Sequence, residues 1–288
     1  MKLPVPVNLA RAQLGPQFAA WRAALPDTVA WFAQRWSLQV GSPFAPGGSS
    51  AWVAPALTAD GHAVALKLGW RHAEADDEAA GLRAWAGDGA VRLHADHVEG
   101  ATSGLLLELC RPGGALRRTA EPDQDRVLAE LLPRLWSAPV TGACFRSLQA
   151  LCDAWADDAQ RRVTPAVTGS DFGIVRAGAE LLRALPASAQ DAVLLVTDLH
   201  AGNVLAAERE PWLMIDPKPY VGDRAFDVLQ HMLNCDRLLT GPRRLSRRLA
   251  TLLELDSERL ERWLFARCAI EADQNPGLAH VARILSPS

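Results

Sequence analysis

The stretch Leu194-Leu-Val-Thr-Asp-Leu-His-Ala-Gly-Asn-Val-Leu205 is the most informative part of this sequence, together with Trp212-Leu-Met-Ile-Asp-Pro217, which follows it after a short polar segment. The acid Asp198 and the amide Asn203 are separated by four residues. Apolar residues on both sides of the polar segment predict a short hairpin, whose second strand ends in Asp216. Because a hairpin brings its two ends together, we expect two carboxylates and one neutral amide around one small space.

This set of groups suits phosphoryl transfer. Mg²⁺ prefers hard oxygen ligands and keeps several waters, so one carboxylate and one amide suffice beside the phosphates of a nucleotide. The remaining carboxylate can orient an acceptor hydroxyl and accept its proton. Either Asp198 or Asn203 alone would be better interpreted as a turn or helix cap, but the combination with Asp216 favours the chemical role.

The composition predicts a globular protein. The chain has 288 residues, 49% of them hydrophobic and 22% charged, which allows one domain or a two-lobed unit. A net charge of −3 gives no basic excess for nucleic acid, and no run reaches the roughly 20 apolar residues that a membrane span requires. The five cysteines form no C-x-x-C pair, so we expect reduced thiols and a cytoplasmic location, without nucleic-acid or membrane partners. The sequence does not indicate an oligomeric state.

The first part of the chain is predicted to be rich in strands. Apolar residues at three- and four-residue steps predict a helix over 8–36, and a turn at Asp60-Gly61 joins two strands within 51–68. Pro55 indicates that the first of these strands lies at an edge or is bulged. A helix over 74–85 and further strands over 91–93 and 104–109 follow.

The second part is predicted to be mainly helical. The run Cys-Arg-Pro-Gly-Gly-Ala-Leu over 110–116 interrupts the strand pattern and is the candidate hinge. The helical periodicity that follows covers 121–137, 147–161, 172–185 and 224–285. We therefore expect an α+β fold with an antiparallel sheet in an N-terminal nucleotide-binding lobe, 1–109, and a helical catalytic and substrate-binding lobe, 110–288.

The segment Asp198-Leu-His-Ala-Gly-Asn203 resembles the catalytic loop of the aminoglycoside phosphotransferases, which have a two-lobed protein-kinase-like fold. The continuation Ile215-Asp-Pro-Lys-Pro-Tyr-Val-Gly-Asp223, with Phe226-Asp-Val228, is similar to the streptomycin and hydroxyurea kinase branch. The resemblance implies ATP and Mg²⁺ as cofactors. It also implies transfer of the γ-phosphate to a hydroxyl of a small molecule, a streptomycin-like aminoglycoside or hydroxyurea.

The resemblance assigns roles to four residues of the second part. Asp198 would be the catalytic base, Asn203 and Asp216 the Mg²⁺ ligands, and Asp227 a brace for the catalytic loop. One departure concerns the two positions before the base, where the family usually has His-Gly and this sequence has Val196-Thr197. The change puts the rigidity of the loop and the catalytic rate in question.

In the first part, the resemblance points to a nucleotide site. Lys67 matches the lysine that pairs with the α- and β-phosphates, and Glu78 matches the helix glutamate that holds it, with Glu74 as the alternative. The residues that would cover the phosphates or border the adenine are Gly47, Gly48, Ser49, Glu108 and Cys110. The glycine pair lacks the full G-x-G-x-x-G pattern, and a plain flexible loop is an equal interpretation.

Three residues are candidates for contact with the acceptor. His200 lies beside the base and would touch substrate or make a structural hydrogen bond. Glu271 and Asp273 would supply negative charge for a cationic acceptor, or would simply face solvent. Asp223 is interpreted as a turn or cap residue.

Two other functions stay open. One is a metabolic small-molecule kinase of the same mechanism, and the other is a nucleotide-binding pseudokinase, which the Val196-Thr197 pair motivates. A protein kinase is disfavoured, because only Pro217 to Asp223 separates Asp216 from the next helix and leaves no room for an activation segment.

Overall fold

The computed structural model describes residues 3–72, 77–140, 145–163 and 172–286. It divides the chain into two compact units. The first comprises Met1–Gly113 with Ala206–Leu213, and the second comprises Gly114–Leu205 with Met214–Ser288. The expected boundary at 109 thus lies four residues earlier than the observed one, and the return of 206–213 to the first unit was not foreseen. Within the described ranges, no helix is long and apolar enough to cross a membrane.

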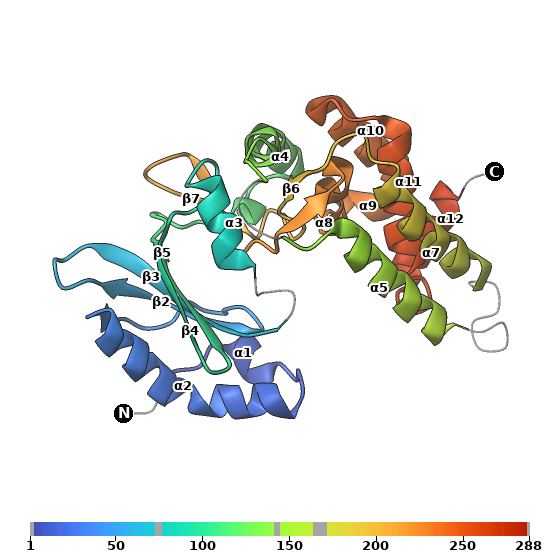
Figure 1. Cartoon of the computed structure of the whole chain (residues 1–288). Helices are drawn as coiled ribbons and strands as arrows, with labels where there is room; N and C mark the ends of the chain where they lie inside the picture. The colour runs from blue at the N-terminus through green and yellow to red at the C-terminus, as the bar shows by residue number, and fades with distance from the viewer. Residues whose placement is uncertain (1–2, 73–76, 141–144, 164–171, 287–288) are drawn as a thin grey trace. The chain divides into compact units, whose positions relative to one another are not determined.

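The first unit contains a five-stranded antiparallel sheet in the order β1-β2-β3-β5-β4 (Figure 1). The strands are β1 Gln39–Val40, β2 Ala51–Leu57, β3 Ala63–Trp70, β4 Leu93–Glu99 and β5 Thr102–Glu108. Three helices accompany them, namely α1 Val7–Arg11, α2 Pro16–Arg35 and α3 Glu78–Trp85. The expected hairpin over 51–68 is present as β2 and β3, and so is the antiparallel sheet of the predicted α+β class, whereas the strand predicted over 91–93 begins only at Leu93.

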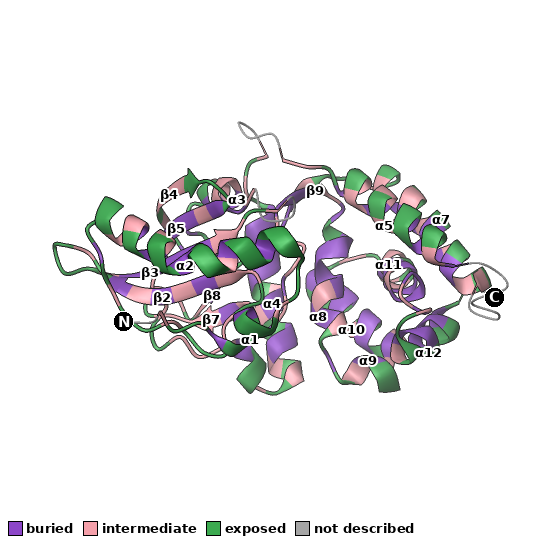
Figure 2. Ribbon diagram, turned by 90° about the horizontal axis from the view of Figure 1, so that it is seen from below, coloured by how far each residue is buried: buried purple, intermediate pink, exposed green. Residues whose placement is uncertain are grey.

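Helix α2 covers one face of this sheet and forms its core. Its buried apolar residues are among those whose spacing predicted the helix, and they are Phe18, Trp21, Leu25, Val29 and Phe32. The contact is close, since a Cβ at Gly104 of β5 would lie 2.1 Å from the Phe32 ring. The opposite side of α2 is largely exposed, as Figure 2 shows.

The predicted helix over 8–36 is interrupted. Gly15 has φ +97°, a conformation that residues with a side chain rarely adopt, and it separates α1 from α2. Pro16 then occupies the first position of α2, where its missing N–H is no loss.

Pro55 lies in β2, which β1 flanks for two residues only. The Pro55 carbonyl accepts a hydrogen bond from Gly41 N at 2.8 Å, just after β1 ends. Because the N–H and C=O of one residue point to the same side of a strand, the missing N–H of Pro55 falls where no ladder partner is required. The strand is therefore not outermost, but the proline behaves as it does at an edge.

The second unit is mainly helical, as expected. Its helices are η1 Leu116–Arg118, α4 Glu121–Trp136, α5 Leu148–Arg162, α7 Phe172–Ala187, η3 Arg224–Val228, α8 Leu229–Leu233, α9 Arg237–Thr240, α10 Pro242–Leu253, α11 Ser257–Ala269 and α12 Pro276–Leu285. Short strands β6 Val193–Leu195 and β9 Tyr220–Gly222 pair with each other. Strands β7 Val204–Ala206 and β8 Trp212–Met214 form the predicted hairpin.

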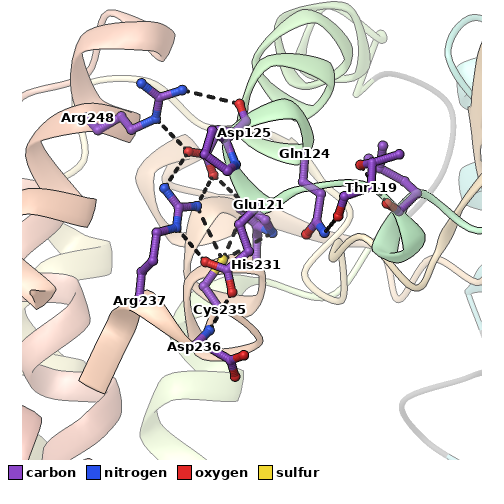
Figure 3. Close-up of polar contacts among 11 residues, drawn as sticks. Thr119, Glu121, Gln124, Asp125, His231, Cys235, Asp236, Arg237 and Arg248 are labelled. Carbon is purple, nitrogen blue, oxygen red and sulfur yellow. Dashed lines mark hydrogen bonds and ion pairs between the residues drawn. The ribbon is translucent and has the colours of Figure 1, made fainter. Parts of the chain in front are cut away.

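A buried charge cluster links α4 to the helices that follow η3 (Figure 3). At its centre, the fully buried Asp125 carboxylate accepts hydrogen bonds from Arg237 at 2.8 and 3.0 Å, Arg248 at 2.6 Å and His231 at 3.0 Å. Burial raises the pKa of the nearby Cys235 thiol to about 12, so this sulfur stays protonated. Since two guanidinium groups already neutralise Asp125, the cluster is an ion-pair network rather than a cation site.

Candidate active site

The predicted catalytic loop lies between β6 and β7. Strand β6 is fixed by its pairing with β9, in the register Val193↔Gly222 and Leu195↔Tyr220. Leu194, Leu195 and Val196 are fully buried, so the chain enters the loop from a packed strand. Asp198 follows two residues later and is partly exposed.

A turn with a strained backbone conformation at Thr197 precedes Asp198 and orients it. Thr197 has φ +54°, and Asp198 N donates to Val196 O at 2.8 Å across it. Positive φ is disfavoured for a β-branched residue and persists only where the surroundings enforce it.

The side chain of Asp227, in η3, holds the backbone of this turn in place. Its carboxylate accepts from Thr197 N at 2.6 Å and Val196 N at 3.0 Å, and Trp136 Nε1 donates to it at 3.0 Å. Burial raises the pKa of Asp227 to about 6, although these three hydrogen bonds act in the opposite direction. The bracing role implied for Asp227 has the geometry it requires, while its effect on catalysis stays a prediction.

A second pair of hydrogen bonds ties the turn to the segment after β8. Lys218 N donates to Val196 O at 3.0 Å, and Thr197 Oγ1 donates to the Lys218 carbonyl at 2.5 Å. A glycine at position 197 would accept the positive φ without strain, but it could not make the second bond. Thr197 thus supplies a tether of its own at a position where the family usually has glycine.

Asn203 and Asp216 are brought together by the hairpin. Asn203 Nδ2 donates to the Asp198 carbonyl at 3.0 Å, and Asn203 O accepts from Ile215 N at 2.9 Å. Ile215 immediately precedes Asp216, which has φ +56°. Because the amide nitrogen of Asn203 is engaged, its amide oxygen is the atom that can bind a cation. With the Asp216 carboxylate this gives a donor set of hard oxygens, which fits Mg²⁺.

Lys218 lies beside the predicted base and was missed by the sequence analysis. Its Nζ is 3.3 Å from Asp198 Oδ2, and both side chains are partly exposed. The signal was available, since Lys218 follows Asp216 by two residues inside the quoted family segment. A lysine between two prolines gives no periodicity that would distinguish it from an exposed loop residue.

His200 makes a local structural contact. Its Nδ1 accepts from Gly202 N at 3.0 Å, and a Cβ at Gly202 would lie 2.6 Å from the ring. Burial lowers the pKa of His200, although the negative charge of Asp198 acts in the opposite direction. The structural alternative therefore has a defined contact, and a contact with substrate stays a prediction.

In the first unit, Lys67 and Glu78 form a buried pair. Lys67 Nζ lies 2.6 Å from both carboxylate oxygens of Glu78, and both residues are buried. Alternation along β3 sends Leu66 and Leu68 into the core under α2 and Lys67 to the other face. Glu78 is the first residue of α3, and the alternative Glu74 lies outside the described residues.

Glu108 and Cys110, at the end of β5, were predicted to border the adenine. The Glu108 carboxylate accepts from Arg209 at 2.9 and 3.0 Å and from Arg92 N at 3.0 Å. Burial acts upward on the pKa of Glu108, but these hydrogen bonds hold it below its ordinary value. Burial also raises the pKa of the Cys110 thiol to about 11. The side chain of Glu108 thus anchors Arg209, and an adenine contact through the backbone stays a prediction.

The predicted phosphate-covering loop is pinned at one end. Gly47 has φ +75°, and a Cβ there would lie 2.5 Å from Pro6. Asn8 Nδ2 donates to the Gly47 carbonyl at 2.8 Å. A Cβ at Gly48 would meet nothing within 4 Å, so the loop is open at this position and at Ser49, which is exposed.

The acids expected to face a cationic acceptor are engaged in ion pairs. Asp273 contacts Arg162 at 3.2 Å and is nearly buried, and Glu271 pairs with Arg267. Their predicted substrate contacts are therefore not supported by any unpaired charge, and they stay predictions. Asp223 caps η3 by accepting from Ala225 N at 3.0 Å, as interpreted from the sequence.

The fold defines the broader class. A choline kinase of Streptococcus pneumoniae matches with a TM-score of 0.60 at 12% identity, over 89% of this chain and 96% of that one. A spectinomycin phosphotransferase matches with a TM-score of 0.53 at 11% identity, over 91% and 94%. The chain has the fold of these small-molecule kinases, and the predicted fold class is confirmed.

Sequence comparison narrows the class to one family. Residues 35–276 match the family described as "Aminoglycoside/hydroxyurea antibiotic resistance kinase". A streptomycin 6-kinase of Streptomyces griseus is 39% identical over 262 residues, 88% of this chain and 83% of that protein. A hydroxyurea phosphotransferase of Kitasatospora aureofaciens is 38% identical over 280 residues, 91% and 77% of the two chains. The chain belongs to this family and is an ATP-dependent small-molecule phosphotransferase, as the resemblance implied.

Proposed function

We propose that the protein transfers the γ-phosphate of ATP to a hydroxyl of a streptomycin-like aminoglycoside, with Asp198 as the base. The observation that carries this proposal is the connected backbone of the site. Asn203 bonds to the Asp198 carbonyl through its side chain and to Ile215 through its backbone, so the base and both candidate metal ligands belong to one hydrogen-bonded unit. Such positioning supplies much of the rate in phosphoryl transfer.

Asn203 and Asp216 would hold Mg²⁺ through their oxygens. Bound there, the ion would neutralise charge on the phosphates. Lys67 would contact the α- and β-phosphates. Its 2.6 Å pair with Glu78 fixes the ammonium at the middle of β3, where the strand ladders on both sides keep it in place.

Asp198 would accept a hydrogen bond from the acceptor hydroxyl and orient its oxygen for attack. The hydroxyl proton would pass to the carboxylate as the oxygen–phosphorus bond forms. Thr197 and Asp227 would keep the carboxylate in position, because four hydrogen bonds fix the turn that precedes it. The Asp227 carboxylate accepts two of them from Val196 N and Thr197 N, and the other two join the turn to the backbone of Lys218. These bonds support an ordered loop at the Val196-Thr197 pair, which motivated the pseudokinase alternative.

Hydroxyurea is the second candidate acceptor. Its support is the hydroxyurea phosphotransferase, whose identity of 38% nearly equals that of the streptomycin 6-kinase. The ion pairs at Glu271 and Asp273 also leave those acids with little charge to offer a cationic acceptor. A neutral acceptor requires no such charge, and the same argument applies to a neutral metabolite.

The proposal is tested by incubating the protein with Mg-ATP and a panel of streptomycin, other aminoglycosides and hydroxyurea, followed by mass spectrometry. We expect a phosphorylated aminoglycoside with the wild type and none with Asp198→Asn. Asp191→Asn is the matched control, because it removes an exposed aspartate just before β6 and should leave turnover unchanged. Product from hydroxyurea alone would favour the second candidate. No product from any compound would overturn both assignments.

A further inference from the structure

Among the residues that the structure describes, Lys218 forms an ion pair with the predicted base. Its Nζ lies 3.3 Å from Asp198 Oδ2, and its side chain is 35% exposed, so a ligand can reach it. This position is fixed by hydrogen bonds of the backbone. The backbone of Lys218 is fixed on both sides, by Lys218 N to Val196 O and by Thr197 Oγ1 to Lys218 O.

The use of lysine is itself informative. The sequence has 30 Lys and Arg residues, and only Lys2, Lys67 and Lys218 are lysines. Every other cation in this chain is arginine. A lysine is a compact point charge on a flexible stem, which suits a phosphoryl oxygen that moves during the reaction, whereas arginine suits a fixed bidentate partner.

We propose that Lys218 is a catalytic residue that donates to the phosphoryl group while it moves from ATP to the acceptor. This inference rests on the proposed function. In the step, the acceptor oxygen forms a bond to the γ-phosphorus, and the bond from that phosphorus to the β,γ-bridging oxygen breaks. The electron pair of the broken bond stays on ADP, and the hydroxyl proton goes to Asp198.

The position of the Lys218 ammonium places it close to the phosphoryl group that is transferred. A hydroxyl held by Asp198 lies within about 3 Å of the carboxylate, and it carries the phosphoryl group once the transfer is complete. An ammonium 3.3 Å from the same carboxylate is therefore a near neighbour of the oxygens that hold charge in the transition state. Donors fixed before the reaction at such a place contribute a large part of the rate.

The first test compares Lys218→Met and Lys218→Arg with the wild type, using the acceptor found with the panel. We expect kcat to fall by about 100-fold or more in Lys218→Met, and Lys218→Arg to recover part of it through its charge. Binding is measured by calorimetry with ADP alone and with ADP, fluoroaluminate and acceptor. The affinity for ADP should change less than about twofold, while the affinity for the transition-state mimic falls with kcat.

A purely structural role would give a different pattern. The affinities for ADP and for the transition-state mimic would then fall equally, and the melting temperature would fall in both variants. This outcome would overturn the proposal. A kcat of Lys218→Met within about threefold of the wild type would overturn it too, since lost transition-state contacts appear in kcat.

Labelling provides a readout that does not depend on turnover. An acyl phosphate of ATP carries its reactive acyl group on the γ-phosphate and transfers it to nearby amines. With three lysines in the chain, peptide mass spectrometry can assign every site. Label on Lys218 that excess ATP prevents would support the proposal even if the wild type phosphorylates no panel member, a result that would count against the proposed function alone. Absence of label on Lys218 while Lys67 is labelled would overturn the proposal.

Discussion

Replacing Asp125 by asparagine should strongly destabilise the second unit. The carboxylate accepts four hydrogen bonds, three from guanidinium groups and one from His231, and it has no exposed surface (Figure 3). Removing one partner of a buried ion pair costs about 3–5 kcal/mol. Because the side chains of Arg237 and Arg248 are 25% and 37% exposed, they recover some hydration, and we expect about 3–4 kcal/mol.

The measurement is urea unfolding followed by circular dichroism, with Asp123→Asn as the matched control. Asp123 lies on the same helix, but its pair with Arg126 is exposed, so its removal should cost less than about 0.5 kcal/mol. Arg248→Met removes one of the four bonds and leaves Asp125 in place. It provides an intermediate loss of about 1–2 kcal/mol should the first variant fail to fold.

The stability lost in Asp125→Asn should also depend on pH, and it should be smaller at low pH. Burial acts upward on the pKa of Asp125, but the hydrogen bonds from His231, Arg237 and Arg248 hold it well below its ordinary value. A carboxyl with a lowered folded-state pKa contributes stability above its unfolded pKa of about 4 and loses it as the pH falls further. The gap between wild type and Asp125→Asn should therefore narrow from pH 7 to pH 3. A gap below about 1 kcal/mol at pH 7, or one independent of pH, would refute this account.

Three further predictions concern the site. Lys67→Met should raise KM for ATP and lower kcat by about 100-fold, and it should also destabilise the first unit, since Glu78 stays buried without its cation; kinetics and thermal unfolding test this. Thr197→Val keeps the branched shape but loses the bond to the Lys218 carbonyl, so stability should fall by about 1 kcal/mol, whereas Thr197→Ser should stay close to the wild type in the same unfolding assay. For Asp227, a folded pKa of about 6 lies above the unfolded value, so its contribution to stability falls as the pH rises from 4 to 7. Asp227→Asn should lack this loss of about 3 kcal/mol, which parallel unfolding curves at the two pH values will show.

Each of these predictions can fail in a recognisable way. Unchanged nucleotide kinetics in Lys67→Met would remove this lysine from the phosphate site. Equal stability of the valine and serine variants would show that the Thr197 hydroxyl contributes nothing. The same pH dependence in wild type and Asp227→Asn would mean that Asp227 does not titrate between pH 4 and 7.

Much of the fold followed from local pattern. The three- and four-residue steps predicted α2, because they record which face of a helix is buried. Two apolar runs around the turn at Asp60-Gly61 predicted the hairpin over 51–68. The hairpin that brings Asn203 to Asp216 was predicted for the same reason. The break at Gly15 was missed, since the apolar period continues across it and only the backbone conformation interrupts the helix.

The contacts that complete the site depend on long-range pairing. Asp227 could be suspected from the family segment, but its bonds to Val196 N and Thr197 N connect residues 31 and 30 positions apart. Lys218 is close to Asp198 only because two backbone bonds bring its segment to the loop. No period in a sequence records such pairings. The family segment supplied candidates for the base, the metal ligands and the brace Asp227, but the bonds that Thr197 and Lys218 make could be read only from the structure.

The return of Ala206–Leu213 to the first unit affects how the protein is made. Arg209 donates to the Glu108 carboxylate and to the carbonyls of Gly87 and Ala90, and these four residues belong to the first unit. On a ribosome, which releases the chain from its N-terminus, this unit must wait for roughly a hundred further residues before Arg209 emerges. Until then Glu108 lacks its cation. A fragment ending at Gly113 would retain the same defect, because the first unit includes a segment from much later in the chain.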